Sequence, residues 1–173
     1  MAITPVIKSF TWPVAEDEQD KHIFSEVNQQ GWHGLHVPAK NKEPNYSFSV
    51  GHYLTKKHPE IIIVGAPEKV AQKLLAQVAL RVQAMDEKLL PNKPYRNFLQ
   101  GLDVAFIPVA MRHYNTYLGF NNWFYGSLEH AYPVLQLVWP DTAGVFPWQR
   151  RYDKRFKALQ PLLGKAPKTV VLH

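Results

Sequence analysis

The chain has 173 residues and a formal net charge of +6, and 46% of its residues are hydrophobic and 20% are charged. This length and composition are typical of one globular domain, and the absence of cysteine excludes disulfides, thiolate nucleophiles and cysteine-ligated metal sites. No apolar stretch approaches the roughly 20 residues of a membrane-spanning helix, and residues 1–12 contain no signal-peptide core, so we expect a soluble, cytoplasmic protein.

The beginning of the chain predicts a helix followed by a strand. Residues 17–30 place apolar side chains at helical spacing, and the next residue is Gly31, which is a favoured residue at a helix C-terminus. Residues 32–37 then have the composition of a strand.

Residues 46–52 alternate between apolar and small or polar side chains. Tyr46, Phe48 and Val50 fall on one face, which predicts a half-buried strand that pairs with its predecessor as a hairpin. In such a strand His52 continues the apolar face to the strand's end.

The remainder of the chain predicts three more strands and three more helices. The four β-branched residues at 61–64 indicate a strand covered on both faces, and the apolar stripe along 67–87 indicates a long amphipathic helix. Pro108 has no N–H to donate, so its strand is expected at a sheet edge or at a bulge. The further elements expected are a strand at 104–109, a short helix at 111–119, a strand at 134–139 and a basic helix at 149–163.

Strict alternation of strands and helices is absent, which favours an α+β fold. We expect one domain, with a mixed or antiparallel sheet of about five strands and helices mainly on one face. This domain is expected to span 17–163, after an N-terminal extension at 1–16 and before a mobile basic tail at 164–173. The expected core includes Phe48, Val50, Ile62, Leu74, Val78, Phe106, Leu135 and Leu137.

The net positive charge is confined to the C-terminal end. Residues 149–173 contain seven basic residues and one acidic residue, whereas the preceding part of the chain is balanced. Such side chains can contact phosphates or an acidic protein, or can form a solvated helix face. Because no nucleic-acid-binding motif accompanies them, we expect at most weak, non-specific nucleic-acid contact, through Arg150, Arg151, Lys154, Arg155 and Lys157.

Five residues are candidates for a ligand-binding pocket: His52, Tyr114, Tyr117, Trp139 and Asp141. Some follow strand ends, where side chains can leave the core, and others lie in a segment rich in aromatic residues. The alternative interpretations are a structural histidine at position 52, a turn-forming aspartate at position 141 and aromatic rings that pack the ends of the sheet.

We expect neither a metal site nor a cofactor. His33 and His36 point to opposite faces of a strand, and no carboxylate stands at a spacing that would complete a ligand set. The isolated glycines match no nucleotide-binding fingerprint.

Several phrases taken together resemble a bacterial family catalogued as domain of unknown function 4262. They are YSFSVG at 46–51, HPEII at 58–62, the aromatic segment at 114–125, YPVLQLVWPD at 132–141 and FPW at 146–148. The resemblance spans roughly residues 20–148, whereas the basic C-terminal segment and His52 lie outside the family's pattern. It implies a small cytosolic bacterial protein and supplies no activity or catalytic residue.

Two functional hypotheses follow. The first is a protein-binding module of immunity or antitoxin type that masks another protein, such as a toxin, because no catalytic constellation is recognisable. The second is a small-molecule or nucleotide-processing enzyme with a pocket formed by the His, Tyr and Asp candidates. The first is preferred, and the chain is not assigned as an enzyme.

Overall fold

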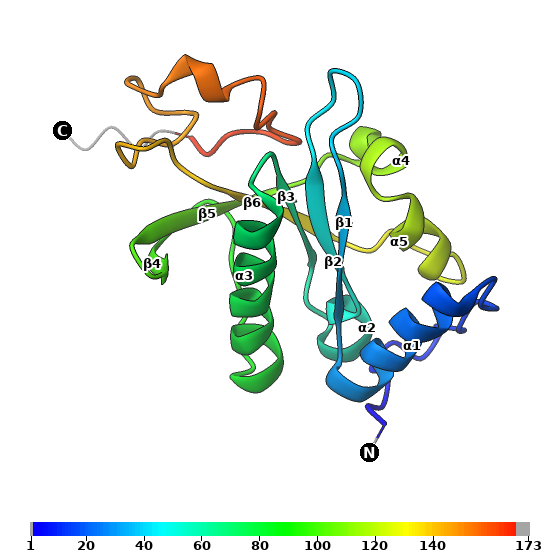
Figure 1. The fold of residues 1–173 in the computed structure, drawn as a ribbon. Coiled ribbons are helices and arrows are strands. Elements are labelled where there is room, and N and C mark those ends of the chain that lie inside the picture. Colours follow the sequence, from blue (N-terminus) through cyan, green and yellow to red (C-terminus); the bar gives the residue numbers. More distant parts are fainter. Residues whose placement is uncertain (1, 169–173) are drawn as a thin grey trace.

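The computed structural model describes residues 2–168, which form one six-stranded sheet flanked by helices (Figure 1). The strands are β1 (His33–Val37), β2 (Tyr46–Val50), β3 (Glu60–Val64), β4 (Pro94–Leu99), β5 (Leu102–Pro108) and β6 (Val134–Val138). The helices are α1 (Glu18–Gln30), α2 (His52–Lys56), α3 (Glu68–Ala79), α4 (Tyr114–Tyr117) and α5 (Gly119–Phe124), with a π-helical turn at Leu80–Ala84 and 3-10 turns at Met111–His113 and Lys154–Phe156.

The sheet is mixed, in the strand order β1-β2-β3-β6-β5-β4. Only β3 and β6 run parallel, and the other neighbours are antiparallel, so the predicted α+β class with a mixed sheet is confirmed. The sixth strand is β4, in a segment for which the sequence pattern predicted no strand. Its prolines, its asparagines and the irregular pairing between Tyr95 and Leu99 hide the alternation that marks a strand.

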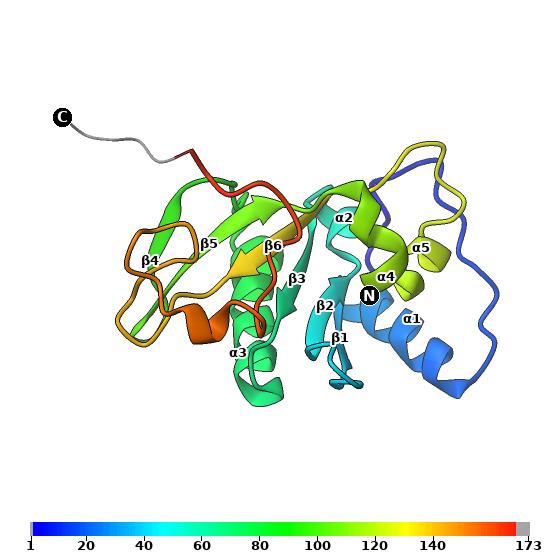
Figure 2. The same ribbon diagram turned by 90° about the horizontal axis from the view of Figure 1, so that it is seen from above.

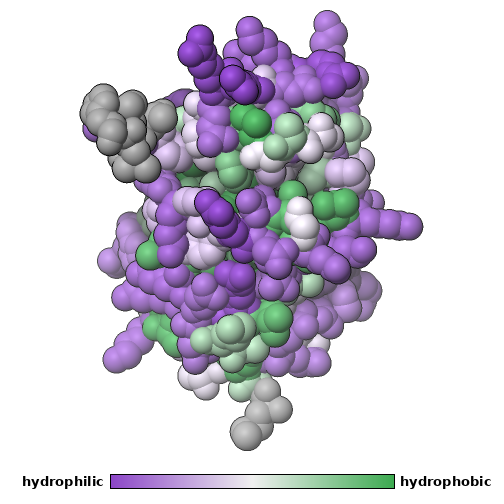
Figure 3. Space-filling view, turned by 90° about the vertical axis from the view of Figure 1, so that its left-hand side faces the viewer, coloured by the Kyte–Doolittle hydropathy of each residue, from purple (hydrophilic) through white to green (hydrophobic). Residues whose placement is uncertain are grey.

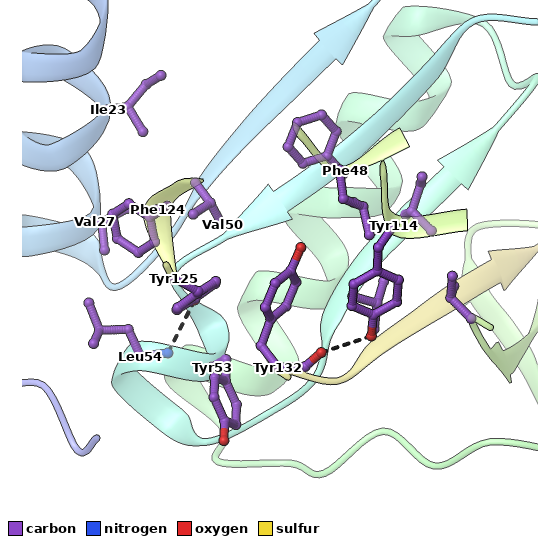
Figure 4. Close-up of a cluster of buried hydrophobic side chains, with 14 of the residues drawn as sticks. Ile23, Val27, Phe48, Val50, Tyr53, Leu54, Tyr114, Phe124, Tyr125 and Tyr132 are labelled. Atoms are coloured by element: carbon purple, nitrogen blue, oxygen red, sulfur yellow. Dashed lines mark hydrogen bonds between the residues drawn. The ribbon is translucent and has the colours of Figure 1, made fainter. Parts of the chain in front are cut away.

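The two faces of the sheet are covered by different helices (Figure 2). Helices α1, α4 and α5 lie on one face, over a cluster that contains Phe48, Val50 and Ile62 (Figure 4). Helix α3 covers the other face, over a cluster that contains Phe106 and Leu137. All eight residues of the predicted core are buried, and three of the four helices that cover the faces share one face, as expected.

Strand β2 is buried on both faces, so the prediction of a half-buried strand was wrong. Its small residues Ser47 and Ser49 lie beneath α3 and are as inaccessible as Phe48 and Val50. Small polar side chains let the helix approach this face of the strand closely, and alternation alone does not reveal that cover.

Pro108 ends a strand that is internal, and not one at an edge. Strand β5 lies between β4 and β6, but β4 pairs only with residues up to Ala105. At Pro108, on the side that faces β4, no strand residue is paired that could accept a hydrogen bond from a backbone N–H. A proline, which has no N–H, is therefore tolerated here although the strand is not at an edge and has no bulge at this position.

The predicted basic helix at 149–163 does not form. This segment contains only the 3-10 turn at Lys154–Phe156; Pro147 precedes the segment, and Pro161 lies within it. Of the predicted mobile tail, residues 169–173 lie outside the described residues. The predicted short helix at 111–119 is divided instead into the 3-10 turn and α4, and Gly119 begins α5.

The residues before α1 run along the helices on the first face. Ile7 is buried in the cluster beneath α1 and α5, and the Val6 N–H donates to the Leu54 carbonyl oxygen over 2.8 Å. Within residues 2–168, no helix combines the length and the apolar character that crossing a membrane would require.

Candidate functional site

The junction between β2 and α2 is built on Gly51. This residue has a φ of 112°, and a Cβ there would lie 2.6 Å from the Gly31 carbonyl oxygen, so the position admits only glycine without rearrangement. The left-handed turn ends the strand at Val50 and starts α2 at His52. The alternation predicted that His52 continues the apolar face of the strand. This prediction was wrong, because the strand ends at Val50 and His52 begins α2.

Glu60 caps this junction from the first position of β3. Its Oε1 accepts hydrogen bonds from the Gly51 N–H over 2.9 Å and from the Tyr53 N–H over 3.0 Å. Because α2 has no side-chain cap of its own, the carboxylate satisfies N–H groups at the start of this short helix. Glu60 was not among the predicted site residues, although an acidic residue at the head of the apolar run at 61–64 is a signal that could have identified it.

Two hydroxyl groups complete the set of donors to Glu60. Ser49 donates from Oγ to Oε2 over 2.6 Å, and Tyr125 donates from its hydroxyl to Oε1 over 2.6 Å. The Ser49 hydroxyl also accepts from the Ile61 N–H over 2.9 Å, and that of Tyr125 accepts from the Leu54 N–H over 3.3 Å. Figure 4 shows the second of these bonds. We call Ser49, Gly51, Tyr53, Glu60 and Tyr125 the Glu60 cluster.

The Glu60 carboxyl is fully buried, and no cationic side chain of residues 2–168 lies within ion-pair distance of it. Burial raises the pKa of Glu60 to about 7, and the bonds from Ser49, Tyr125 and the two backbone N–H groups oppose the rise. A solute cannot reach a fully buried carboxyl. The cluster therefore holds β2, β3, α2 and α5 together, and its geometry does not resemble that of an open catalytic site.

His52, the first of the predicted site residues, is also fully buried. Its ring stacks on Trp32 with centroids 5.5 Å apart, and its Nδ1 lies 2.9 Å from Gln83 Nε2. Burial, with a smaller contribution from the charge of His58, lowers the pKa of His52 to about 3, so the ring is neutral. Its Nε2 has no hydrogen-bond partner among the described residues.

The two predicted tyrosines belong to the packing between α4 and the sheet. The Tyr114 side chain is buried and donates from its hydroxyl to the Tyr132 carbonyl oxygen over 2.8 Å (Figure 4). Tyr117 is half-buried and packs edge-on against Tyr46, with ring centroids 5.0 Å apart. Within residues 2–168, neither tyrosine hydroxyl forms a hydrogen bond with His52.

Trp139 and Asp141 organise the loop that follows β6. The Trp139 indole N–H donates to the Val64 carbonyl oxygen over 2.9 Å. Asp141 Oδ1 accepts from the N–H groups of Ala143 and Val145, and Oδ2 accepts from that of Asp153, each over 2.9 Å. These bonds, that of Val145 most, lower the pKa of Asp141, and they match the turn-forming role given above as the alternative.

The fold separates His52 from Asp141. His52 follows the carboxyl end of β2, which is antiparallel to β3, whereas Asp141 follows the carboxyl end of β6, which is parallel to β3. The two residues therefore lie at opposite ends of the sheet, roughly 16 Å apart for a five-residue strand. The five candidate residues do not converge on one cavity, so the single His, Tyr and Asp pocket is not formed.

The basic C-terminal segment forms a cavity of its own. It has a volume of about 570 Å³ and is lined by Pro147, Gln149, Arg150, Tyr152, Lys154, Lys157, Gln160, Pro161 and Leu162. Within residues 2–168, no carboxylate forms an ion pair with Arg150, Lys154 or Lys157, and all three are exposed. We call these three residues the basic cradle.

The segment that carries the basic cradle is fixed to the end of β6 although it is not helical. The Gln160 carboxamide accepts from the Trp139 N–H over 3.0 Å and donates to the Trp139 carbonyl oxygen over 2.9 Å. Asp141 holds the same segment through Asp153. Tyr152 lines the same cavity, and its hydroxyl is buried with no hydrogen-bond partner among the described residues. Arg155, in contrast, pairs with Asp153 over 2.7 Å.

Among the described residues, no group of three or more histidine and acidic side chains is arranged to hold a metal ion. In comparisons with known proteins, a family model described as Domain of unknown function (DUF4262) matches residues 26–153, which is more than half of the chain. No curated protein and no solved structure matches the chain.

Proposed function

The chain belongs to the DUF4262 family, and on that premise we propose that it is a protein-binding module of immunity or antitoxin type that docks an acidic surface of its partner, such as a toxin. The basic cradle is the observation that carries this proposal. Three exposed cations that form no ion pair within residues 2–168 attract and orient a surface rich in Asp and Glu, because charge complementarity steers association and fixes the docking register.

The composition of the cavity lining favours a protein as the partner. Pro147, Pro161 and Leu162 supply apolar surface between the charges, and the Tyr152 side chain lines the same cavity. A patch that combines apolar contacts with Arg, Tyr and a polar rim has the composition of a protein interface.

The alternative is a small-molecule or nucleotide-processing enzyme that uses the His, Tyr and Asp candidates. It needs these groups within reach of one substrate, but His52 and Tyr114 are buried and Asp141 lies at the other end of the sheet. The geometry therefore favours the binding module. We place this module in the bacterial cytosol, since its fold uses no disulfide.

The product of the adjacent coding sequence is the first partner to test, and a toxin there would support the proposal, whereas a metabolic operon would favour the enzyme. The variant R150E/K154E/K157E reverses the cradle. The control K42E/K69E/K73E makes the same change of charge at exposed lysines that form no ion pair within the described residues.

We expect the control to bind the partner as the wild type does and the cradle variant to bind at least about tenfold more weakly in calorimetric titration. The binding should weaken as salt is raised, because the cradle is exposed. Equal affinity of the two variants for the partner would overturn the proposed role of the cradle.

A further inference from the structure

A second cavity, of about 400 Å³, lies between β4 and the C-terminal segment, and nothing in the function proposed above uses it. Its volume is within the range of pockets that hold small ligands. The side of the molecule that carries β4 is mainly hydrophilic, and its hydrophobic residues are scattered in small groups (Figure 3). A ligand for this cavity should therefore be polar, with a limited apolar part.

Trp148 supplies an aromatic wall for that apolar part. Its indole stacks on Phe146 with ring centroids 5.1 Å apart and planes 4° from parallel. Phe146 is buried and holds the indole from one side, and Trp148 is half-buried and lines the cavity. A rigid, supported indole is a platform for a flat ring, and nucleobases stack on such platforms whatever their sequence.

Cations line the same cavity. Lys93, Arg96 and Lys168 are exposed there, and no carboxylate of residues 2–168 forms an ion pair with any of them. Lys93 Nζ lies 4.8 Å from the centre of the Tyr95 ring, which restrains its side chain. A guanidinium with two ammonium groups is the donor set that proteins use for phosphate.

Asp103 is the acidic residue of the lining. Its Oδ1 accepts from the Asn97 N–H over 2.8 Å, which fixes the side chain and leaves Oδ2 as an acceptor. A carboxylate opposes the binding of a second carboxylate or of a bare inorganic anion, but it accepts well from a sugar hydroxyl or a base amine. The lining therefore matches a ligand that has a ring, a hydroxyl or amine donor, and a phosphate.

We propose that this cavity binds a nucleotide with its phosphate. The base stacks on Trp148, the phosphate lies among Arg96, Lys93 and Lys168, and Asp103 accepts from the sugar or from the base. This site is separate from the basic cradle, and the two cavities share only Gln149 as a wall residue. The nucleotide can be free or can be one residue of a single strand, and the chemistry of recognition is the same.

The test titrates the four ribonucleoside monophosphates, adenosine and inorganic phosphate into the full-length protein by calorimetry. At least one monophosphate should bind about tenfold more tightly than either adenosine or inorganic phosphate. A single-stranded trinucleotide distinguishes the two sources: tighter binding than the monophosphate indicates a strand, and equal or weaker binding indicates the free nucleotide.

Three variants separate the contribution of base stacking to monophosphate binding from that of the phosphate contacts. Trp148→Phe should keep monophosphate binding, Trp148→Leu should weaken it about tenfold, and Arg96→Gln should reduce it to the level of the nucleoside. Arg96 is exposed, so its variant tests the site even if Trp148→Leu disturbs folding. Trp123→Leu is the control at a half-buried tryptophan of α5, outside this cavity. The proposal fails if no monophosphate binds, if inorganic phosphate binds as tightly, or if folded Trp148→Leu binds as the wild type does.

Discussion

Glu60 is the residue whose protonation state matters most to this fold. In all four of its side-chain hydrogen bonds the Glu60 carboxyl is the acceptor, which favours the ionised carboxylate. Burial without a neighbouring cation favours the neutral acid instead. The two effects oppose each other, and the balance leaves the pKa at about 7 in the folded chain, compared with 4.5 for a free side chain.

The raised pKa makes the contribution of Glu60 to stability depend on pH. Between pH 4.5 and 7 the folded state keeps a proton that the unfolded state has released, so a rise in pH favours unfolding. We expect the free energy of unfolding of the wild type to decrease relative to that of Glu60→Gln by on the order of 3 kcal/mol over this window. Urea denaturation of both proteins at half-unit intervals of pH measures the difference.

His52 changes the pH dependence of stability in the opposite direction. The contribution of Glu60 is therefore measured as the difference between the wild type and Glu60→Gln. Its pKa is lowered to about 3, so below pH 6.5 the unfolded state takes up a proton that the folded state excludes, and stability falls as the pH falls. The two contributions partly cancel in the wild type between pH 4.5 and 6.5. Glu43→Gln, at an exposed carboxylate, is the control for the loss of one negative charge. A difference between wild type and Glu60→Gln that does not change with pH would contradict the assignment.

At the scale of elements, the junction between β2 and α2 depends on Gly51. Gly51→Ala should cost about 4 kcal/mol or prevent folding, because the added methyl group meets the Gly31 backbone 2.6 Å away at a φ of 112°. Gly101→Ala is the matched control, since Gly101 also has a positive φ, of 74°, but has nothing within 4 Å of the added atom. Its cost should be about 1 kcal/mol, which is the conformational penalty alone. Thermal and urea unfolding compare the two variants, and equal costs would show that the close approach is not limiting.

At the scale of the whole molecule, the concentration of positive charge at one end predicts how the protein meets a polyanion. Duplex DNA should bind weakly and without sequence preference, because its bases are stacked and only its phosphates can contact exposed cations. For three contacts at the basic cradle, the logarithm of the binding constant should fall with that of salt at a slope of about −3. Fluorescence anisotropy with two unrelated duplexes of about 20 base pairs measures this slope, and the cradle variant should bind more weakly and with a shallower slope. Binding that prefers one sequence or persists at high salt would contradict a purely electrostatic contact.

Local patterns in the sequence determined most of the fold. The helix at α1, the apolar run of β3, the amphipathic α3 and the eight core residues are all recognisable because each depends on spacing or on a continuous β-branched run. Strand β4 and the irregular C-terminal segment were missed. In β4 turn-forming residues interrupt the alternation, and in the C-terminal segment Asp141 and Gln160 supply partners from distant positions that replace helical bonds.

Which polar residues meet was decided only by the tertiary structure. Sequence spacing could not show that the strand directions place His52 and Asp141 at opposite ends of the sheet, because the order of strands in a sheet is set by long-range pairing. The same pairing brings Ser49, Glu60 and Tyr125 together from three separate segments. The sequence by itself determined where charge and apolar side chains are available. The folded sheet determined which of them are buried as a cluster and which remain at the surface to bind, since burial depends on neighbours that are far apart in the chain.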